Sequence, residues 1–115
     1  MVSSTVQQIA QQNDQFRQGN PNVPGQRFIT MGINELLKQH EVDGDDIMRM
    51  VSEFNVFTDD NDPYGEHDFG SFEFGGKKCF WKIDYYDLNY QGGSDDPSDL
   101  SKTNRVLTIM LADEY

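Results

Sequence analysis

Residues 68–87 read DFGSFEFGGKKCFWKIDYYD, two runs of β-forming residues separated by a pair of glycines. The runs Asp68 to Phe74 and Lys77 to Asp87 predict two strands, and Gly75-Gly76 is typical of a two-residue hairpin turn. Successive side chains of a strand point to opposite faces, so the second run has a mainly apolar face and a mixed face. The first face carries Cys79, Trp81, Ile83 and Tyr85, and the second carries Phe80, Lys82, Asp84 and Tyr86. The hairpin is therefore expected to cover a hydrophobic core with one face.

The remainder of the chain supplies helices and two more strands around this hairpin. Apolar residues recur at helical spacing in three segments, and two further segments are rich in β-forming residues. The expected helices are residues 3–20, a short helix through Leu36 and Leu37, and a helix that begins near Asp43, and the expected strands are residues 27–31 and 105–112. This pattern indicates an α+β fold, an antiparallel sheet of about four strands with two or three helices on one face. Residues 1–115 are expected to form this single domain.

Size and composition set the class of protein. The chain has 115 residues, which one domain accounts for, and Leu, Ile, Val and Phe make up 27 of them. That share lies above the roughly 20% below which acidic chains stay disordered. The single cysteine, Cys79, cannot form an internal disulfide. The sequence has neither an apolar run of roughly 20 residues nor a secretion signal, so we expect a cytoplasmic protein.

Acidic residues are concentrated in two blocks. The formal net charge is -11, from 20 Asp and Glu against 9 Lys and Arg. Residues 41–68 hold ten acids and one base, and residues 84–99 hold five acids and no base, so the blocks carry -14 and the rest of the chain +3. Phosphates and anionic lipid would repel such a protein, which argues against direct binding of nucleic acid or membrane. The blocks indicate either a solvated, solubilising surface or a surface that docks on a basic partner.

The densest polar cluster, residues 59–68 (DDNDPYGEHD), raises the question of metal binding. Asp60, Asp62 and Gly65 match three positions of an EF-hand calcium loop. Ser71 stands where a bidentate Glu would have to close the calcium shell, and no helix pattern flanks both sides. We therefore expect no metal site here.

Catalytic patterns are equally sparse. His40 and His67 are far apart in the chain and Cys79 is alone, so neither a transition-metal site nor a cofactor is expected. Cys79 falls on the inward face beside Trp81, which favours an inert buried thiol over a nucleophile. No phosphate-binding glycine loop or nucleophile elbow is present, so an enzyme is not expected. The alternative function is a small hydrolytic or ligand site, built around Tyr64, Glu66, His67 and Asp68.

Three longer blocks carry a resemblance to known proteins: residues 61–70 (NDPYGEHDFG), 80–87 (FWKIDYYD) and 105–115 (RVLTIMLADEY). Over about residues 27–115 the chain resembles a small proteobacterial family of unknown function that occurs largely on plasmids and other mobile elements. That family has no assigned catalytic or binding residues, so none can be transferred. With this resemblance, the alternative function becomes a mobile-element accessory protein with a small hydrolytic or ligand site around Glu66, His67 and Asp68. In size, acidity and overall pattern the chain also looks like a prophage-encoded anti-CRISPR protein directed against the type I-F surveillance complex.

The second resemblance implies a non-enzymatic, stoichiometric inhibitor in the bacterial host cell that prevents the complex from engaging target DNA. A complex that captures duplex DNA exposes Lys and Arg to phosphates, and carboxylates on a rigid surface can occupy the same groups. We therefore expect an acidic DNA mimic. Its partner would be the basic DNA-binding surface of the CRISPR surveillance complex, on the large subunit.

Helix chemistry explains some of the acids and leaves the others for a partner. Asp43, Asp45 and Asp46 suit the start of a helix, where carboxylates cap the backbone and the helix dipole favours negative charge. The acids of the expected loops have no such structural need. The expected partner-binding residues are Asp59, Asp60, Asp62, Glu66, Asp95, Asp96 and Asp99. A structural alternative is dimerisation through a sheet edge or through the glutamine-rich first helix.

Overall fold

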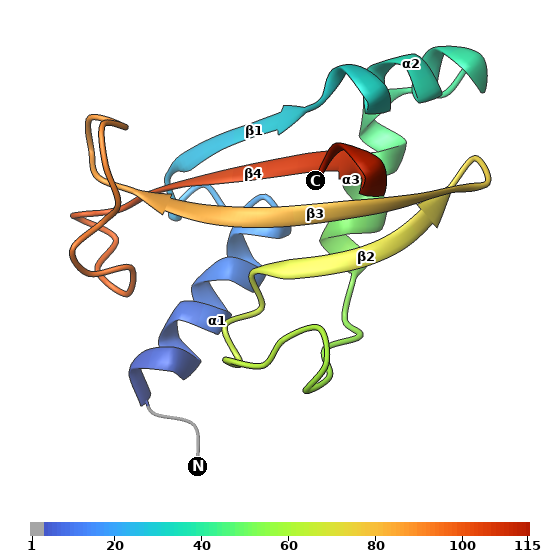
Figure 1. Ribbon diagram of the computed structural model, residues 1–115. Coiled ribbons are helices and arrows are strands. Elements are labelled where there is room, and N and C mark those ends of the chain that lie inside the picture. Colours follow the sequence, from blue (N-terminus) through green and yellow to red (C-terminus); the bar gives the residue numbers. More distant parts are fainter. Residues whose placement is uncertain (1–3) are drawn as a thin grey trace.

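The computed structural model describes residues 4–115, and a four-stranded sheet lies at its centre (Figure 1). These residues form three α-helices and four strands, and a short 3-10 helix follows the last strand. The elements are α1 (Ser4–Arg17), β1 (Gly25–Ile29), α2 (Met31–Gln39), α3 (Gly44–Glu53), β2 (Phe69–Phe74), β3 (Lys77–Tyr86), β4 (Asn104–Leu111) and η1 (Ala112–Glu114). The expected α+β class is confirmed. The expected start of the first helix, residue 3, lies outside the described residues.

The sheet is mixed, with the strand order β1-β4-β3-β2. β3 pairs antiparallel with both β2 and β4, but β1 pairs parallel with β4, with Gly25 opposite Arg105 and Ile29 opposite Ile109. The expectation of a wholly antiparallel sheet is therefore wrong for β1. The connection through α2 and α3 carries the chain from one edge of the sheet to the other, and a helical crossover of this kind returns it in the same direction. β1 and β2 thus run parallel at opposite edges, and β3 and β4 fill the space between them, as in a split β-α-β unit.

One face of the sheet packs against the helices. Trp81 of β3 and Ile109 of β4 are fully buried there against Phe16 of α1, Ile33 of α2 and Val51 of α3. Burial of apolar surface against one face of the sheet is the main stabilising contribution to such a two-layer fold. The expected inward face of β3 is confirmed.

The opposite face of the sheet carries no α-helix within the described residues. Phe69, Phe80 and Tyr115 form an aromatic cluster on this side, with ring centroids 4.9 to 5.9 Å apart. η1 lies in front of the sheet in the view of Figure 1 and brings Tyr115 to that face. The molecule therefore has a helical side and an open sheet side.

Two local predictions are confirmed by backbone geometry. Gly75 and Gly76 both have positive φ, 60° and 76°, as the two-residue hairpin between β2 and β3 requires. The Asp43 carboxylate accepts a hydrogen bond from the Asp45 amide at 3.2 Å and caps α3. Asp45 and Asp46 lie in the first turn, where the helix dipole favours carboxylates.

The hydropathy of the helices bears on membrane insertion. Over residues 4–115, none of the helices is both long enough and apolar enough to cross a bilayer.

Candidate functional site

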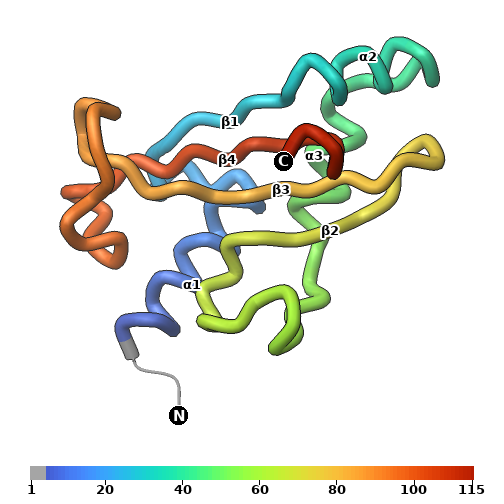
Figure 2. Tube along the Cα trace, viewed as in Figure 1, coloured from blue at the N-terminus to red at the C-terminus, as the bar shows by residue number. Residues whose placement is uncertain are grey.

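Two acidic loops flank helix α1. The α3–β2 loop (residues 54–68) and the β3–β4 loop (residues 87–103) contain the acids expected to bind a partner. The Gln12 side chain donates a hydrogen bond to the Ser98 carbonyl at 2.8 Å, and the adjacent Asn13 donates to the Glu66 carbonyl at 2.9 Å. Figure 2 shows α1 between the two loops. Neighbouring residues of one helix therefore fix both acidic loops.

The exposed side of α1 is neutral. Its buried side holds the apolar residues Ile9 and Phe16 together with the polar contacts to the loops. The exposed residues of the α1 region include Gln7, Gln8, Gln11 and Gln18. The surface between the two acidic loops is thus rich in primary amides, which can both donate and accept hydrogen bonds.

A buried polar network ties the loops to the sheet. Arg105 of β4 is fully buried, and its Nε donates to Asn13 Oδ1 at 2.6 Å. Asn13 in turn donates to the Tyr85 hydroxyl at 2.8 Å, and that hydroxyl donates to Glu66 Oε1 at 2.9 Å. Arg105 also donates to the carbonyl of Pro97 in the β3–β4 loop at 3.0 Å. Burial raises the pKa of Tyr85, so the network contains a neutral phenol that can donate to Glu66.

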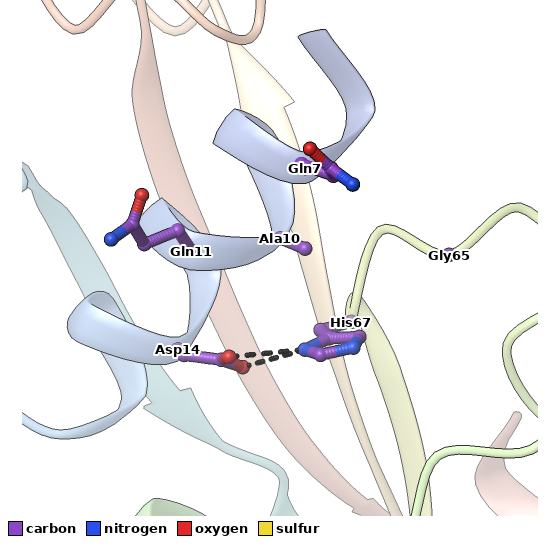
Figure 3. Close-up of a pocket in the computed structure, with 6 residues that line it drawn as sticks. All are labelled: Gln7, Ala10, Gln11, Asp14, Gly65 and His67. Carbon is purple, nitrogen blue, oxygen red and sulfur yellow. Dashed lines mark hydrogen bonds and ion pairs between the residues drawn. The ribbon is translucent and has the colours of Figure 1, made fainter. Parts of the chain in front are cut away.

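A hollow of about 390 Å³ opens between α1 and the α3–β2 loop (Figure 3). In Figure 3 Asp14 and His67 point toward each other, and His67 Nδ1 lies 3.0 Å from both carboxylate oxygens of Asp14. The other imidazole nitrogen, Nε2, lies 3.7 Å from Asp62 Oδ2. The ring is stacked on Phe57, with centroids 3.9 Å apart and planes 2° from parallel. His67 is therefore held between two carboxylates, with φ 57° at its own backbone.

Arg17 contacts Asp14 of this pair and joins α1 to the end of α3. Its guanidinium donates to Asp14 Oδ1 at 2.7 Å and to the carbonyls of Val51 and Phe54 at 2.7 and 2.9 Å. It also lies over the Trp81 ring, with Cζ 4.7 Å from the centroid. The Val51 carbonyl also accepts the backbone N–H of Phe54 at 3.3 Å, so Arg17 adds a second donor there and supplies a side-chain donor to the Phe54 carbonyl at the end of α3.

The loop acids fall into two groups, which corrects one expectation. Three of them have structural roles: Asp62 is buried and accepts from the His67 amide at 3.1 Å, while Asp96 and Asp99 each accept from the amide and hydroxyl of a serine two residues on. The expectation that no loop acid has a structural need is wrong for these three, because short aspartate side chains readily close turns on their own backbone. Hydrogen bonds from Ser101 also lower the pKa of Asp99.

The other expected partner-binding residues differ in their side-chain contacts. Within the described part of the chain, the side chains of Asp59, Asp60 and Asp95 are exposed and make no hydrogen bond or ion pair. Glu66 is half-buried and accepts from Tyr85. The structure therefore leaves Asp59, Asp60 and Asp95 free for a partner.

At Asp68, the last residue of the α3–β2 loop, the fold raises the pKa of the carboxyl. Burial raises its pKa to about 6, and the nearby charges of Glu66, Asp62 and Asp84 add to the effect. Removal from water disfavours the charged form, and so does each neighbouring carboxylate. Asp68 is therefore partly protonated near neutral pH.

The alternative polar site is only partly assembled. Tyr64 is 78% exposed, and Glu66 is engaged by Tyr85, so neither side chain joins His67 in the hollow. Asp14 of α1, which the sequence did not single out, is the partner of His67 instead. Among the described residues no group of three His, Cys, Asp or Glu side chains has the geometry of a metal site.

One missed residue had a signal in the sequence. Arg105 lies two residues before Leu107 and four before Ile109, so strand alternation already places it on the inward face. Asp14 had no comparable signal, because its contact with His67 joins residues 53 positions apart. Only the packing of α1 against the loop brings them together.

The fold and the site define a small α+β protein with two acidic loops joined to one helix. The chain belongs to the family described as "Protein of unknown function (DUF3768)", whose model matches residues 29–114. A comparison with curated proteins found no match, and a search of solved structures found none either. The family description assigns no activity.

Proposed function

We propose that this protein is a non-enzymatic inhibitor that acts as an acidic mimic of DNA. Its partner is the basic DNA-binding surface of a nucleic-acid-binding complex, and the anti-CRISPR resemblance suggests the type I-F surveillance complex as that partner. The observation that carries the proposal is the charge of -14 in two blocks whose loops flank α1.

Electrostatics supports a basic partner. Carboxylates held on a structured surface attract Lys and Arg side chains that otherwise bind phosphates, and this attraction also accelerates association. Asp59, Asp60 and Asp95 are exposed without internal partners, so binding would not have to break contacts within the protein. The amide-rich surface of α1 lies between the loops and can add hydrogen bonds to the same partner.

An order-of-addition experiment tests the mechanism. The protein is mixed with purified type I-F complex before or after target duplex, and DNA binding is followed by gel shift. A competitor for the DNA site blocks binding when it is added first and acts much less once DNA is seated. Loss of cleavage with unchanged DNA binding would contradict the mimic mechanism, and failure to recover the complex in a pull-down would contradict the partner.

The free loop acids should carry a measurable part of the affinity. We expect the triple variant Asp59→Asn, Asp60→Asn and Asp95→Asn to remain folded and to bind roughly tenfold more weakly, since exposed ion pairs contribute about 0.5 kcal/mol each. Calorimetry or surface plasmon resonance with the complex measures this change.

A matched control separates position from total charge. The variant Glu35→Gln, Glu73→Gln and Asp113→Asn also removes three negative charges, but from exposed positions outside both blocks. We expect it to bind like the wild type. Equal weakening of both triple variants would leave a solvated acidic surface as the better account of the blocks.

A second candidate function is a small hydrolytic or ligand site. The observation that favours it is the Asp14–His67 pair, which faces the hollow beside α1. A carboxylate that orients an imidazole is a common arrangement for general-base chemistry. A screen of the wild type and His67→Gln against chromogenic ester and phosphate substrates tests this candidate. The candidate requires that the wild type turns over a substrate and that His67→Gln does not.

A further inference from the structure

β1 is an edge strand whose outer side is open. Within the described residues it pairs with β4 alone, and Figure 1 shows it along the border of the sheet with no strand beyond it. The last four of its five residues, Gln26 to Ile29, are exposed. An unpaired strand edge presents backbone donors and acceptors to which a further strand can bind.

The hydrogen bonds to β4 show which backbone groups of β1 point outward. The Pro24 carbonyl accepts from an amide of β4 at 3.2 Å, and the Thr30 amide donates to a carbonyl of β4 at 3.0 Å. The backbone groups of successive residues in a strand point in opposite directions, so those of the even-numbered positions face β4. The N–H and C=O groups of Arg27 and Ile29 therefore point away from the sheet.

The common protections of an edge strand are absent from β1. Natural edges are often blocked by proline, by a bulge or by charged side chains. β1 contains no proline, its pairing with β4 is continuous, and Arg27 is its single charged residue. The Arg27 guanidinium is turned back to α1, where it donates to the Phe16 carbonyl and lies 4.3 Å from the centroid of the Phe16 ring. The apolar side chains of Phe28 and Ile29 remain 51% and 37% exposed.

The charge distribution favours a second copy of the chain as the occupant of this edge. Two molecules of net charge -11 repel each other, and the two acidic blocks account for that charge. Residues 18–34, which contain β1, hold no Asp or Glu, so two copies can meet there without opposed acids. Glu114, which reaches the end of β1, is engaged by Thr30 and Gly32. The other edge strand, β2, contains Glu73 and directly follows the first acidic block.

We infer that two copies of this chain pair through β1, antiparallel about a two-fold axis, so that their sheets join into one. Outward-pointing residues must then face each other. Among the registers that allow this, the one centred on Phe28 places Arg27 opposite Ile29 of the second copy and keeps the two Arg27 side chains apart. It also places the two Phe28 rings opposite each other in a non-hydrogen-bonded pair, where side chains are closest. This contact uses neither acidic loop and does not depend on the proposed function.

Sedimentation equilibrium of the full-length protein tests the association. We expect the mass of the wild type to rise with concentration from that of one chain towards that of two. Phe28→Lys places two ammonium groups across the axis and removes the aromatic pair, so it should associate roughly tenfold more weakly. Leu88→Lys makes the same charge change at a similarly exposed residue of the β3–β4 loop and should associate at least as well as the wild type. A wild type that stays monomeric, or equal weakening in both variants, would overturn the inference.

Hydrogen exchange of the wild type tests the pairing without a variant. In the dimer the amides of Arg27 and Ile29 gain carbonyl acceptors, whereas those of Gln26 and Phe28 face β4 in both states. We expect protection that rises with protein concentration at Arg27 and Ile29 and changes little at Gln26 and Phe28. Protection that stays constant at Arg27 and Ile29 while the mass doubles would place the contact elsewhere and overturn the inference.

A cysteine on the axis tests the register. Mild oxidation with diamide should link Phe28→Cys into a disulfide dimer, because opposed side chains of a non-hydrogen-bonded pair are close enough to bridge. Gln26→Cys is the matched control: it is exposed on the same face but stands opposite Thr30 of the second copy, so it should link much less. The native Cys79 is buried in both variants. Equal linking of the two variants would contradict the register centred on Phe28.

Discussion

At Asp68 the fold places a half-buried carboxyl beside other acids, which raises its pKa to about 6. Its ordinary value is about 3.9, so the folded state binds this proton more tightly than the unfolded chain does. We expect the free energy of unfolding to rise as the pH falls from 7.5 to 5, because protonation of Asp68 relieves an unfavourable buried charge. Urea unfolding at several pH values measures the slope.

The variant Asp68→Asn isolates this effect from any other pH-dependent contribution to stability. The amide is neutral at every pH, so the variant should be more stable than the wild type at pH 7.5 and should lose the Asp68 part of the slope. If the variant kept the wild-type slope, the pH dependence would belong to another group.

The side chains of the loop acids divide into a group with structural hydrogen bonds and a group without them. Asp96 and Asp99 close turns on their own backbone, whereas Asp59 and Asp60 are exposed without partners in the described structure. Acids placed close together without compensating contacts repel one another and weaken the compact state. In the proposed function, these free charges contact a basic partner.

Among the elements, α1 and α3 share the hydrophobic core and are also joined by the buried side chain of Arg17. Arg17 reaches two carbonyls at the end of α3, the Asp14 carboxylate and the Trp81 ring. We expect Arg17→Met to lower the free energy of unfolding by about 3 kcal/mol, since the apolar stem stays but the buried acceptors lose their donor. Chemical denaturation followed by the fluorescence of Trp81 measures the change.

Arg49→Met, in α3, is the matched control for Arg17→Met. Arg49 also pairs with an aspartate three residues before it, but at 3.8 Å and with 67% of its side chain exposed. Exposed pairs of this kind contribute about 0.5 kcal/mol or less. Similar losses in both variants would mean that general helix propensity, and not the buried contacts of Arg17, controls stability.

At the scale of the whole molecule, charge and the open sheet face give two distinct surfaces. The acidic loops flank α1, whereas Phe69, Phe80 and Tyr115 cluster on the face of the sheet that carries no α-helix in the described residues. Binding through the loops and binding through the aromatic cluster differ in physical origin, so they can be told apart.

We expect affinity for the type I-F complex to fall steeply as salt is raised from 0.1 to 1 M. Over this range the Debye length shrinks from about 10 Å to about 3 Å, which screens exposed charge pairs. Equilibrium binding at several salt concentrations measures the slope. Affinity that stays constant would contradict docking through the acidic loops and favour an apolar contact through Phe69, Phe80 and Tyr115.

How far the fold could be predicted depends on the range of the interactions involved. The β2–β3 hairpin and the start of α3 were predicted correctly because glycine turns and aspartate caps act over a few residues. The direction of β1 was predicted wrongly because its partner, β4, lies near the other end of the chain and is set by the α2–α3 crossover. Local patterns contain no information on that route.

For the candidate site, sequence located the charge but not its organisation. Local sequence is enough to predict three features: the two acidic blocks, the inward face of β3 and the helix cap at Asp43. Each depends on the types and spacing of residues that are close together in the chain. Tertiary packing alone joined Asp14 to His67, buried Arg105 against Asn13, and brought both loops to α1. Such contacts form because burying the apolar face of α1 brings distant polar groups together, and those groups must then find partners out of water.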